Sequence, residues 1–229
     1  MSEAIVILSG GLDSTVSAIL AQKEVPLKLA ITFDYGQRAT LKEQQSALRI
    51  AKDLGIEHKI ISLPWLKELT PTALVRGGQA LPLLNISELD DREKTNLSAR
   101  AVWVPNRNGL FLNVAAVFAE SLDCALIVTG FNKEEAVTFS DNSASFVESA
   151  NHFFSFSTLS NVMVKSYTQE MTKVEIVQKG IALGVDFSNL WSCYEGGPKM
   201  CGVCESCLRS LRAYQQAGVL EKVKAIYEN

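Results

Sequence analysis

The chain has 229 residues, of which 47% are hydrophobic and 21% are charged. This length accommodates one large α/β domain with a small additional region, and the composition excludes disordered and fibrous proteins. The 22 Lys and Arg residues against 25 Asp and Glu give a net charge of -3, so no global positive field attracts nucleic acid or an anionic membrane. We find neither a signal-peptide pattern nor an apolar run of membrane-spanning length, so we expect a cytoplasmic protein.

Apolar strands and amphipathic helices alternate along most of the chain. The expected strands, rich in β-branched and other apolar residues, are 4–9, 27–34, 57–63, 125–129 and 162–164. The expected helices are 14–22, 39–54, 110–122, 143–156 and 174–183. Gly55 and Gly184 each follow a helix at the position that favours a left-handed cap. The alternation predicts a Rossmann-like α/β fold with a doubly wound parallel sheet.

Segment 64–100 interrupts this alternation. Its glycines, prolines and the charge run ELDDREK at 88–94 give no sustained period. We expect a long loop or lid, with the charge run on a solvated face.

The first sharp motif is SGGLDST at 9–15, between the first expected strand and the first expected helix. Two adjacent glycines let backbone amides approach a phosphate, and the helix N-terminus adds its positive end. Beside a phosphate, the Asp13 carboxylate is best explained as a ligand of magnesium or water. A capped strand-to-helix turn without a ligand is the alternative. The motif is neither G-x-x-x-x-G-K-[ST] nor G-x-G-x-x-G, and it resembles the pyrophosphatase loop of ATP-dependent adenylating enzymes.

The second sharp motif is a group of cysteines near the C-terminus. Of five cysteines, four have a spacing that lets their thiolates converge on one ion: Cys193, Cys201, Cys204 and Cys207. Four sulfur ligands close the coordination of zinc and indicate a structural site, whereas an iron–sulfur cluster is the main rival and a redox dithiol a weaker one. Cys124 starts an expected strand and is predicted to be a buried small apolar residue.

These motifs, together with DYGQR at 34–38, VPNRN at 104–108 and CGVCESCLR at 201–209, closely resemble the 7-cyano-7-deazaguanine synthase family of queuosine biosynthesis. The resemblance covers nearly the whole chain. It implies an adenine nucleotide alpha hydrolase-like fold, with a nucleotide-binding domain over 1–190 and a zinc-binding region over 191–229 packed on it. It also suggests a homodimer.

The resemblance implies that ATP, used with Mg²⁺, adenylates 7-carboxy-7-deazaguanine, that ammonia gives an amide, and that a second activation gives the nitrile. Positioning and electrostatics would carry such a reaction. It implies phosphate-binding roles for Ser9, Gly10, Gly11, Asp13, Ser14 and Thr15. It implies substrate-binding roles for Tyr35, Gln37, Arg38, Arg107, Asn108 and Asp141. The catalytic roles that it implies fall on Asp13, Arg107 and Lys173.

One stretch departs from the family pattern. Where the family carries a tyrosine-proline-aspartate-cysteine-arginine string, only Asp141 remains in this chain. Loss of an arginine changes which groups can be clamped. The alternative is therefore an adenylating ligase that couples a deazaguanine carboxylate to a protein amine in an antiphage system. A zinc module that binds nucleic acid is a third hypothesis, which the net charge disfavours.

Overall fold

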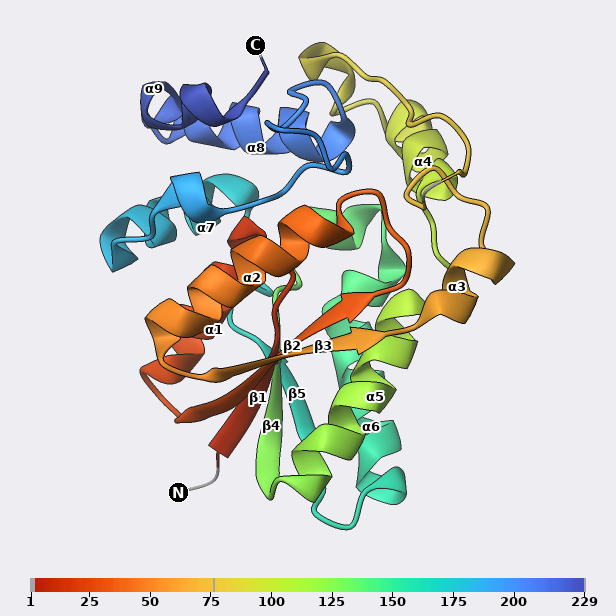
Figure 1. Ribbon diagram of the computed structural model, residues 1–229, viewed down its shortest axis with the longest axis vertical. Helices are drawn as coiled ribbons and strands as arrows, with labels where there is room; N and C mark the ends of the chain where they lie inside the picture. Colours follow the sequence, from red (N-terminus) through yellow and green to blue (C-terminus); the bar gives the residue numbers. More distant parts are fainter. Residues whose placement is uncertain (1–2, 76, 229) are drawn as a thin grey trace.

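The computed structural model describes residues 3–75 and 77–228 of the chain. Five strands of this part form one sheet in the order β3-β2-β1-β4-β5, and each neighbouring pair is parallel (Figure 1). The strands are β1 (Glu3–Ile7), β2 (Leu27–Asp34), β3 (Glu57–Ser62), β4 (Cys124–Thr129) and β5 (Met163–Ser166). The predicted doubly wound α/β fold is confirmed.

Helices cover both faces of the sheet. The helices are α1 (Leu12–Gln22), α2 (Thr40–Leu54), α3 (Pro64–Leu69), α4 (Arg92–Ala101), α5 (Arg107–Ser121), α6 (Ala144–Ser157), α7 (Lys173–Leu183), α8 (Glu205–Gln216) and α9 (Leu220–Val223). Residues of α1, α2 and α7 share one apolar cluster with the sheet, and residues of α5 and α6 share the other. No helix of the described residues is long and apolar enough to cross a membrane.

Burial on both faces explains why the central strands are continuously apolar. In β1, Ala4 and Val6 belong to the cluster under α1, and Ile5 between them belongs to the cluster under α5. Successive side chains of a strand point to opposite faces, so both faces need apolar residues. All three side chains are fully buried.

The strand order reverses beside β1. The chain moves from β1 to β2 and β3 on one side, and then returns to place β4 and β5 on the other side. In open α/β sheets, ligands bind at such a reversal, outside the carboxyl ends of the strands. The turn that carries SGGLDST follows β1 and therefore lies at this point.

Most expected elements agree with the structure within about three residues, but segment 64–100 differs. It holds helices α3 and α4 and a 3₁₀ turn at Ile86–Glu88, so the prediction of a long loop or lid was wrong there. Pro64 occupies the first turn of α3, where a missing N–H costs nothing. The Asp91 side chain caps α4 by accepting from the backbone N–H groups of Glu93 and Lys94. Asp91 through Lys94 are exposed, as predicted for the charge run.

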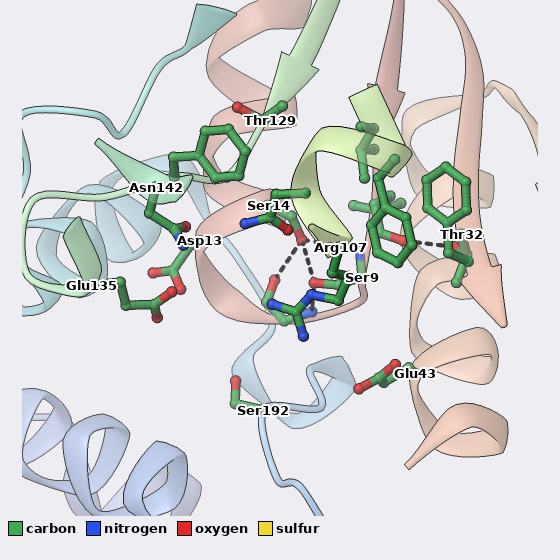
Figure 2. A pocket seen from close by; sticks show the side chains of 18 of the residues that line it. Ser9, Asp13, Ser14, Thr32, Glu43, Arg107, Thr129, Glu135, Asn142 and Ser192 are labelled. Carbon is green, nitrogen blue, oxygen red and sulfur yellow. Dashed lines mark hydrogen bonds between the residues drawn. The ribbon is translucent and has the colours of Figure 1, made fainter. Parts of the chain in front are cut away.

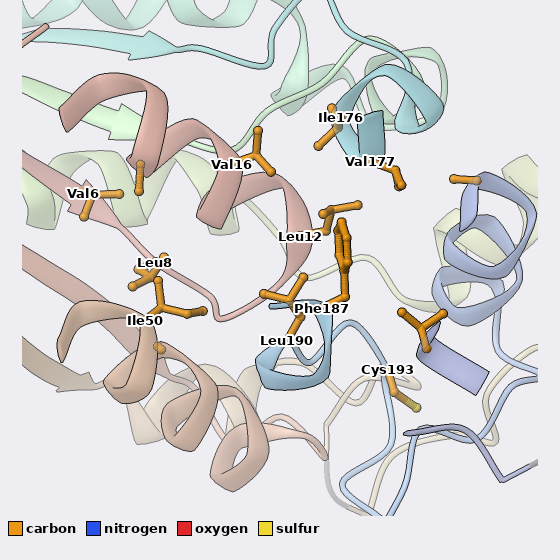
Figure 3. Close-up of a cluster of buried hydrophobic side chains, with 14 of the residues drawn as sticks. Val6, Leu8, Leu12, Val16, Ile50, Ile176, Val177, Phe187, Leu190 and Cys193 are labelled. Carbon is orange, nitrogen blue, oxygen red and sulfur yellow. The ribbon is translucent and has the colours of Figure 1, made fainter. Parts of the chain in front are cut away.

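The C-terminal region packs on the same side as α1 and α7. Its buried residues Met200, Tyr214 and Tyr227 belong to one apolar cluster with Leu12 of α1. Figure 3 shows the part of this cluster that leads from α1 through Phe187 and Leu190 to Cys193. The cysteine segment is thereby fixed against the helix that follows the glycine loop.

Candidate active site

The two glycines of the loop have different structural roles. Gly10 has φ +79°, and a Cβ atom there would lie 2.7 Å from the carbonyl oxygen of Glu43 and 2.7 Å from Cβ of Ser46. Gly11 has φ -85° and caps α1 without a side-chain hydrogen bond. A Cβ atom on Gly11 would have 3.5 Å to its nearest neighbour. Gly10 therefore lets the loop pack on α2, whereas Gly11 keeps the first turn of α1 open.

Hydroxyl groups of the loop form a local network. The hydroxyls of Ser9 and Ser14 lie 3.1 Å apart, and the Ser9 backbone N–H donates to Ser14 Oγ at 3.3 Å. Thr15 Oγ1 instead donates to the carbonyl oxygen of Gly11 at 2.7 Å. Ser9 is thus exposed on the loop, Ser14 is buried beside it, and Thr15 stabilises the first turn of α1.

A cavity of about 1150 Å³, open solvent at its mouth included, lies in front of this loop. It is called the first cavity below. The residues predicted to bind phosphates or substrate or to act in catalysis that line it are Ser9, Gly11, Asp13, Ser14, Tyr35, Gln37, Arg107, Asn108 and Lys173, and the predicted metal ligand Cys193 also lines it. Figure 2 shows side chains from the loop, from α5 and from the segment after β4 gathered around it. The fold therefore brings together motifs that are separated by more than a hundred positions in the sequence.

Lys173 forms a buried charge cluster at the floor of the first cavity. Its Nζ donates to Asp13 Oδ2 at 2.5 Å and to Glu135 Oε1 at 3.0 Å, and its side chain is only 7% exposed. Thr172 caps α7 and places Lys173 in the first helical turn. Figure 2 shows the carboxylates of Asp13 and Glu135 pointing toward one another. One cation thus neutralises two carboxylates that would otherwise repel each other.

The pKa values in this cluster follow from burial and mutual attraction. Burial raises the pKa of Asp13 to about 6 against the attraction of Lys173. Burial would also raise the pKa of Glu135, but the charge and hydrogen bond of Lys173 outweigh it and lower that pKa. Burial would lower the pKa of Lys173, but Asp13 and Glu135 hold it above its ordinary value. Asp13 therefore loses its charge first as the pH falls, while Lys173 keeps its own.

Asp13 also carries an oxygen without a partner. Its Oδ1 is buried and accepts no hydrogen bond in the described structure. Such an atom loses its hydration without compensation, so it is an acceptor available to a cation or a donor group of a ligand.

The opposite wall is formed by Tyr35 and Arg107. Arg107 Nη1 donates to the Tyr35 hydroxyl at 3.2 Å, and the Tyr35 ring packs on Phe111 with its centroid 5.7 Å away. Burial raises the pKa of Tyr35, so its hydroxyl remains neutral at pH 7. Gln37 is held by hydrogen bonds to the Phe33 carbonyl oxygen and to Glu43. Arg107 is therefore the cation of this wall, and Gln37 positions the turn beside it.

Four residues predicted to bind phosphates or substrate are not among the described residues that line the first cavity: Gly10, Thr15, Arg38 and Asp141. Arg38 donates to the carbonyl oxygens of Ala73 and Gln79 and pairs with Glu195 at 3.3 Å, so it ties the segment before α4 to the cysteine region. The Asp141 carbonyl oxygen accepts from Asn108 at 3.2 Å. The next residue, Asn142, reaches the first cavity instead.

The structure adds lining residues to which the motifs assigned no role. Besides Asn142, the first cavity is lined by Glu43, Glu135, Ser192, Tyr194 and Ser206. Ser192, Tyr194 and Ser206 are each next to one of the predicted metal-binding cysteines in the sequence. This proximity is the sequence signal that could have indicated them. Glu135 follows β4 in a short 3₁₀ turn and has no sequence pattern around it.

The four C-terminal cysteines converge as predicted. Their sulfur atoms all lie within 4.8 Å of one another, and those of Cys201 and Cys207 are 3.9 Å apart. Four sulfurs at about 2.3 Å from one zinc ion stand about 3.8 Å apart, so the group fits a single tetrahedral ion. Hydrogen bonds led by Cys193 lower the pKa of Cys201 and raise the pKa of Cys204 and Cys207. A bound cation would stabilise all four thiolates. Cys124 is buried in β4, as expected.

The fold and the first cavity define an α/β protein with a doubly wound parallel sheet and a glycine loop that lines a cavity at the carboxyl ends of its strands. A solved 4-thiouridine synthetase, in complex with RNA and with bound ATP, has the same fold, with a TM-score of 0.50 at 18% identity over 98% of this chain and 52% of that chain. The sequence matches the family described as "Queuosine biosynthesis protein QueC" over residues 3–218. The chain belongs to this family.

Relatives in this family are similar over nearly their whole length. The 7-cyano-7-deazaguanine synthase of Pelotomaculum thermopropionicum is 51% identical over 94% of this chain and 98% of that protein. The synthase of the same name from Bdellovibrio bacteriovorus is 47% identical over 95% of this chain and 94% of that protein. The resemblance stated from the motifs is confirmed.

Proposed function

We propose that this protein makes 7-cyano-7-deazaguanine from 7-carboxy-7-deazaguanine, ammonia and ATP. The observation that carries the proposal is the 51% identity, over nearly the full length of both chains, to a protein named for this product. The first cavity supports it, because the predicted phosphate loop and two cations, Lys173 and Arg107, line the same space.

The reaction consumes two molecules of ATP. The substrate carboxylate attacks the α-phosphorus of ATP, and pyrophosphate leaves. Ammonia then attacks the acyl carbon, AMP leaves and an amide remains. The amide oxygen attacks a second ATP, pyrophosphate leaves again, and loss of AMP and a proton gives the nitrile. Both substrate oxygens end on AMP, so no water is released.

In this proposal the loop holds the departing phosphates. Ser9, Gly11, Asp13 and Ser14 line the first cavity at the start of α1, where the positive end of the helix dipole and the serine hydroxyls would favour phosphate. Lys173 supplies a positive charge at the same place. Stabilising the negative charge of the leaving pyrophosphate is the main requirement of the reaction.

Two metal ions belong to the proposal. Mg²⁺ bound with ATP would take the unpaired Asp13 Oδ1 as a ligand, since hard cations prefer carboxylate oxygens. When bound, it neutralises phosphate charge. Zn²⁺ would be held by Cys193, Cys201, Cys204 and Cys207, and its role would be structural because four thiolates leave no open position.

The test is turnover by the purified protein alone. With 7-carboxy-7-deazaguanine, MgATP and ammonium, we expect 7-cyano-7-deazaguanine by mass spectrometry and two AMP per nitrile. Omission of ammonium should leave AMP formation at a low level. The absence of both AMP and nitrile in metal-replete protein would contradict the proposal.

The same assay addresses the remaining expectations. No observation on the described residues favours transfer to a protein amine, and a nitrile formed without a second protein would exclude the need for one. That the protein is a homodimer stays a prediction. A measurement of its molar mass in solution tests it.

The two glycines provide a paired prediction. Gly10→Ala should lower the free energy of unfolding by at least about 1–3 kcal/mol. Alanine is strained at φ +79°, and its Cβ would collide with α2. Gly11→Ala should leave stability within about 0.5 kcal/mol. Its methyl group would lie 3.5 Å from Ser9 Oγ in the lining of the first cavity, so ATP affinity should fall by about tenfold. Urea unfolding and ATP titration measure the two effects. Equal losses of stability in both variants would refute the different roles of the two glycines.

A further inference from the structure

A second cavity adjoins the first and is not lined by the glycine loop. It measures about 630 Å³, open solvent at its mouth included. It shares Arg107, Glu135, Asn142, Lys173, Tyr194 and Ser206 with the first cavity. Lys173 and Arg107 therefore stand at the boundary between two neighbouring spaces, one of which contains the glycine loop.

The lining of the second cavity includes a carboxylate with one free oxygen. Glu205 is the first residue of α8 and is only 3% exposed. Its Oε1 accepts two hydrogen bonds from Arg209, at 2.9 Å from Nε and 2.7 Å from Nη2. Its Oε2 is buried and has no partner. Because both donors of Arg209 are directed to the same oxygen, the arginine orients the carboxylate and leaves Oε2 free.

This free oxygen is not an ordinary feature of the molecule. Among the buried side-chain atoms without a partner in residues 3–75 and 77–228, the carboxylate oxygens are Asp13 Oδ1 and Glu205 Oε2. One lies at the first cavity and the other at the second. A buried carboxylate oxygen without a donor is costly, and such groups mark places where a ligand supplies the donor.

The lining of the second cavity also includes an aromatic side chain. Phe139 lines it, and the Phe139 ring is parallel to the Trp103 ring within 5°, with the centroids 6.3 Å apart. A planar heterocycle packs well on an aromatic face. The second cavity is thus lined by an aromatic ring, by the Glu205 carboxylate and by the cations Arg107, Lys173 and Arg209.

We propose that the second cavity binds the heterocycle of the acid substrate and that Glu205 Oε2 accepts a hydrogen bond from its exocyclic 2-amino group. This inference rests on the proposed function. A deazaguanine carries the amino group at one end and the 7-carboxylate at the other. With the amino group on Glu205, the carboxylate is directed to the boundary where Lys173 and Arg107 lie, beside the phosphate loop. Glu205 is then a specificity residue and does not take part in bond making.

The matched ligand pair for the test is 7-carboxy-7-deazaguanine and its analogue without the 2-amino group, 7-carboxy-7-deazahypoxanthine. Wild-type protein should bind the first about 100-fold more tightly, because a charge-assisted hydrogen bond in a buried site is lost with the second. Titration calorimetry without ATP measures both affinities. Equal affinity of the wild-type protein for the two acids would overturn the inference without any variant.

The variant Glu205→Gln tests the residue itself. If the Gln carbonyl oxygen keeps the Arg209 contacts, its NH₂ group faces the substrate amine, and a donor then meets a donor. We expect the dissociation constant of 7-carboxy-7-deazaguanine to rise about 100-fold, and discrimination between the two acids to fall below about threefold. KM should rise far more than kcat falls. Asp90→Asn is the matched control. Asp90 is also a carboxylate paired with an arginine of α8, Arg212, but its side chain is exposed. It should change neither affinity nor discrimination.

The outcomes separate this inference from the proposed function. If the wild-type protein makes the nitrile and Glu205→Gln, with its full zinc content, still discriminates like the wild type, only the inference fails. Suppose instead that the wild-type protein binds 7-carboxy-7-deazaguanine selectively over its analogue but forms no AMP, and that Glu205→Gln lacks this selectivity. Then only the proposed reaction fails. Should the wild-type protein bind neither acid, both are wrong.

Discussion

Replacing Lys173 with methionine should lower the rate of AMP formation by about 10²–10³-fold, the loss seen when one donor to a developing charge is removed. Lys173 is buried and contacts Asp13 and Glu135 in the ligand-free protein. In the proposed reaction its charge also stabilises the departing pyrophosphate. Methionine has a similar length and no charge, so the shape of the first cavity is largely kept while its cation is lost. Single-turnover measurement of AMP at saturating MgATP checks this prediction.

Lys173→Met should also destabilise the ligand-free protein. Removing the cation leaves Asp13 and Glu135 beside each other without a counter-charge. Breaking a fully buried ion pair costs about 3–5 kcal/mol, and because these side chains are 17% and 34% exposed we expect a loss of about 1–3 kcal/mol. The assay is therefore run at a temperature where the circular dichroism of the variant is that of the native protein. Lys179→Met, at an exposed position of the same helix, is the control and should affect neither rate nor stability. A folded Lys173→Met protein that retains more than a tenth of the wild-type rate would contradict the proposed role.

The fold could be predicted because its signals are local. The strand β2 was expected at 27–34 and is found at Leu27–Asp34, and Gly55 and Gly184 end their helices with φ of 70° and 73° as expected. Segment 64–100 was mispredicted because its helices are short and are specified by single features, such as Pro64 and the Asp91 cap. Short helices give too few turns for a period to stand out.

The candidate site was predictable only where a motif carried it. The glycine loop, Arg107 and Lys173 were identified, and the structure places them around one cavity. Glu135 was missed because its role depends on contact with Lys173 across 38 positions of sequence. Arg38 was placed in the substrate site on the strength of its motif, but its donors are directed to backbone carbonyl oxygens outside the first cavity. Motif membership indicates that a residue matters to the fold or the site, and only geometry separates the two.

The cysteine segment contributes directly to both cavities. Ser192 and Tyr194 flank Cys193, and Glu205 and Ser206 lie between Cys204 and Cys207. Each of these four neighbours lines the first or the second cavity. Ser206 Oγ donates to the Ser192 carbonyl oxygen at 2.6 Å, which joins the two halves of the segment. A metal that fixes the cysteines would therefore also fix a wall of the candidate active site.

Cys201→Ser is accordingly expected to remove zinc, stability and activity together. The free energy of binding a structural zinc ion is largely free energy of folding, and a loss of several kcal/mol should lower the melting temperature of a chain of this size by about 10 °C. Emission spectrometry should find one zinc per wild-type chain and less than a tenth of that in the variant. Nitrile formation should fall below detection, because the part of the cavity wall formed by Tyr194 and Glu205 loosens. Cys124→Ser is the control, since this buried cysteine lies in β4 outside the cluster, and it should keep its zinc. Iron in place of zinc in the wild-type protein, or a Cys201→Ser protein with full activity, would show that a structural zinc ion does not support this wall.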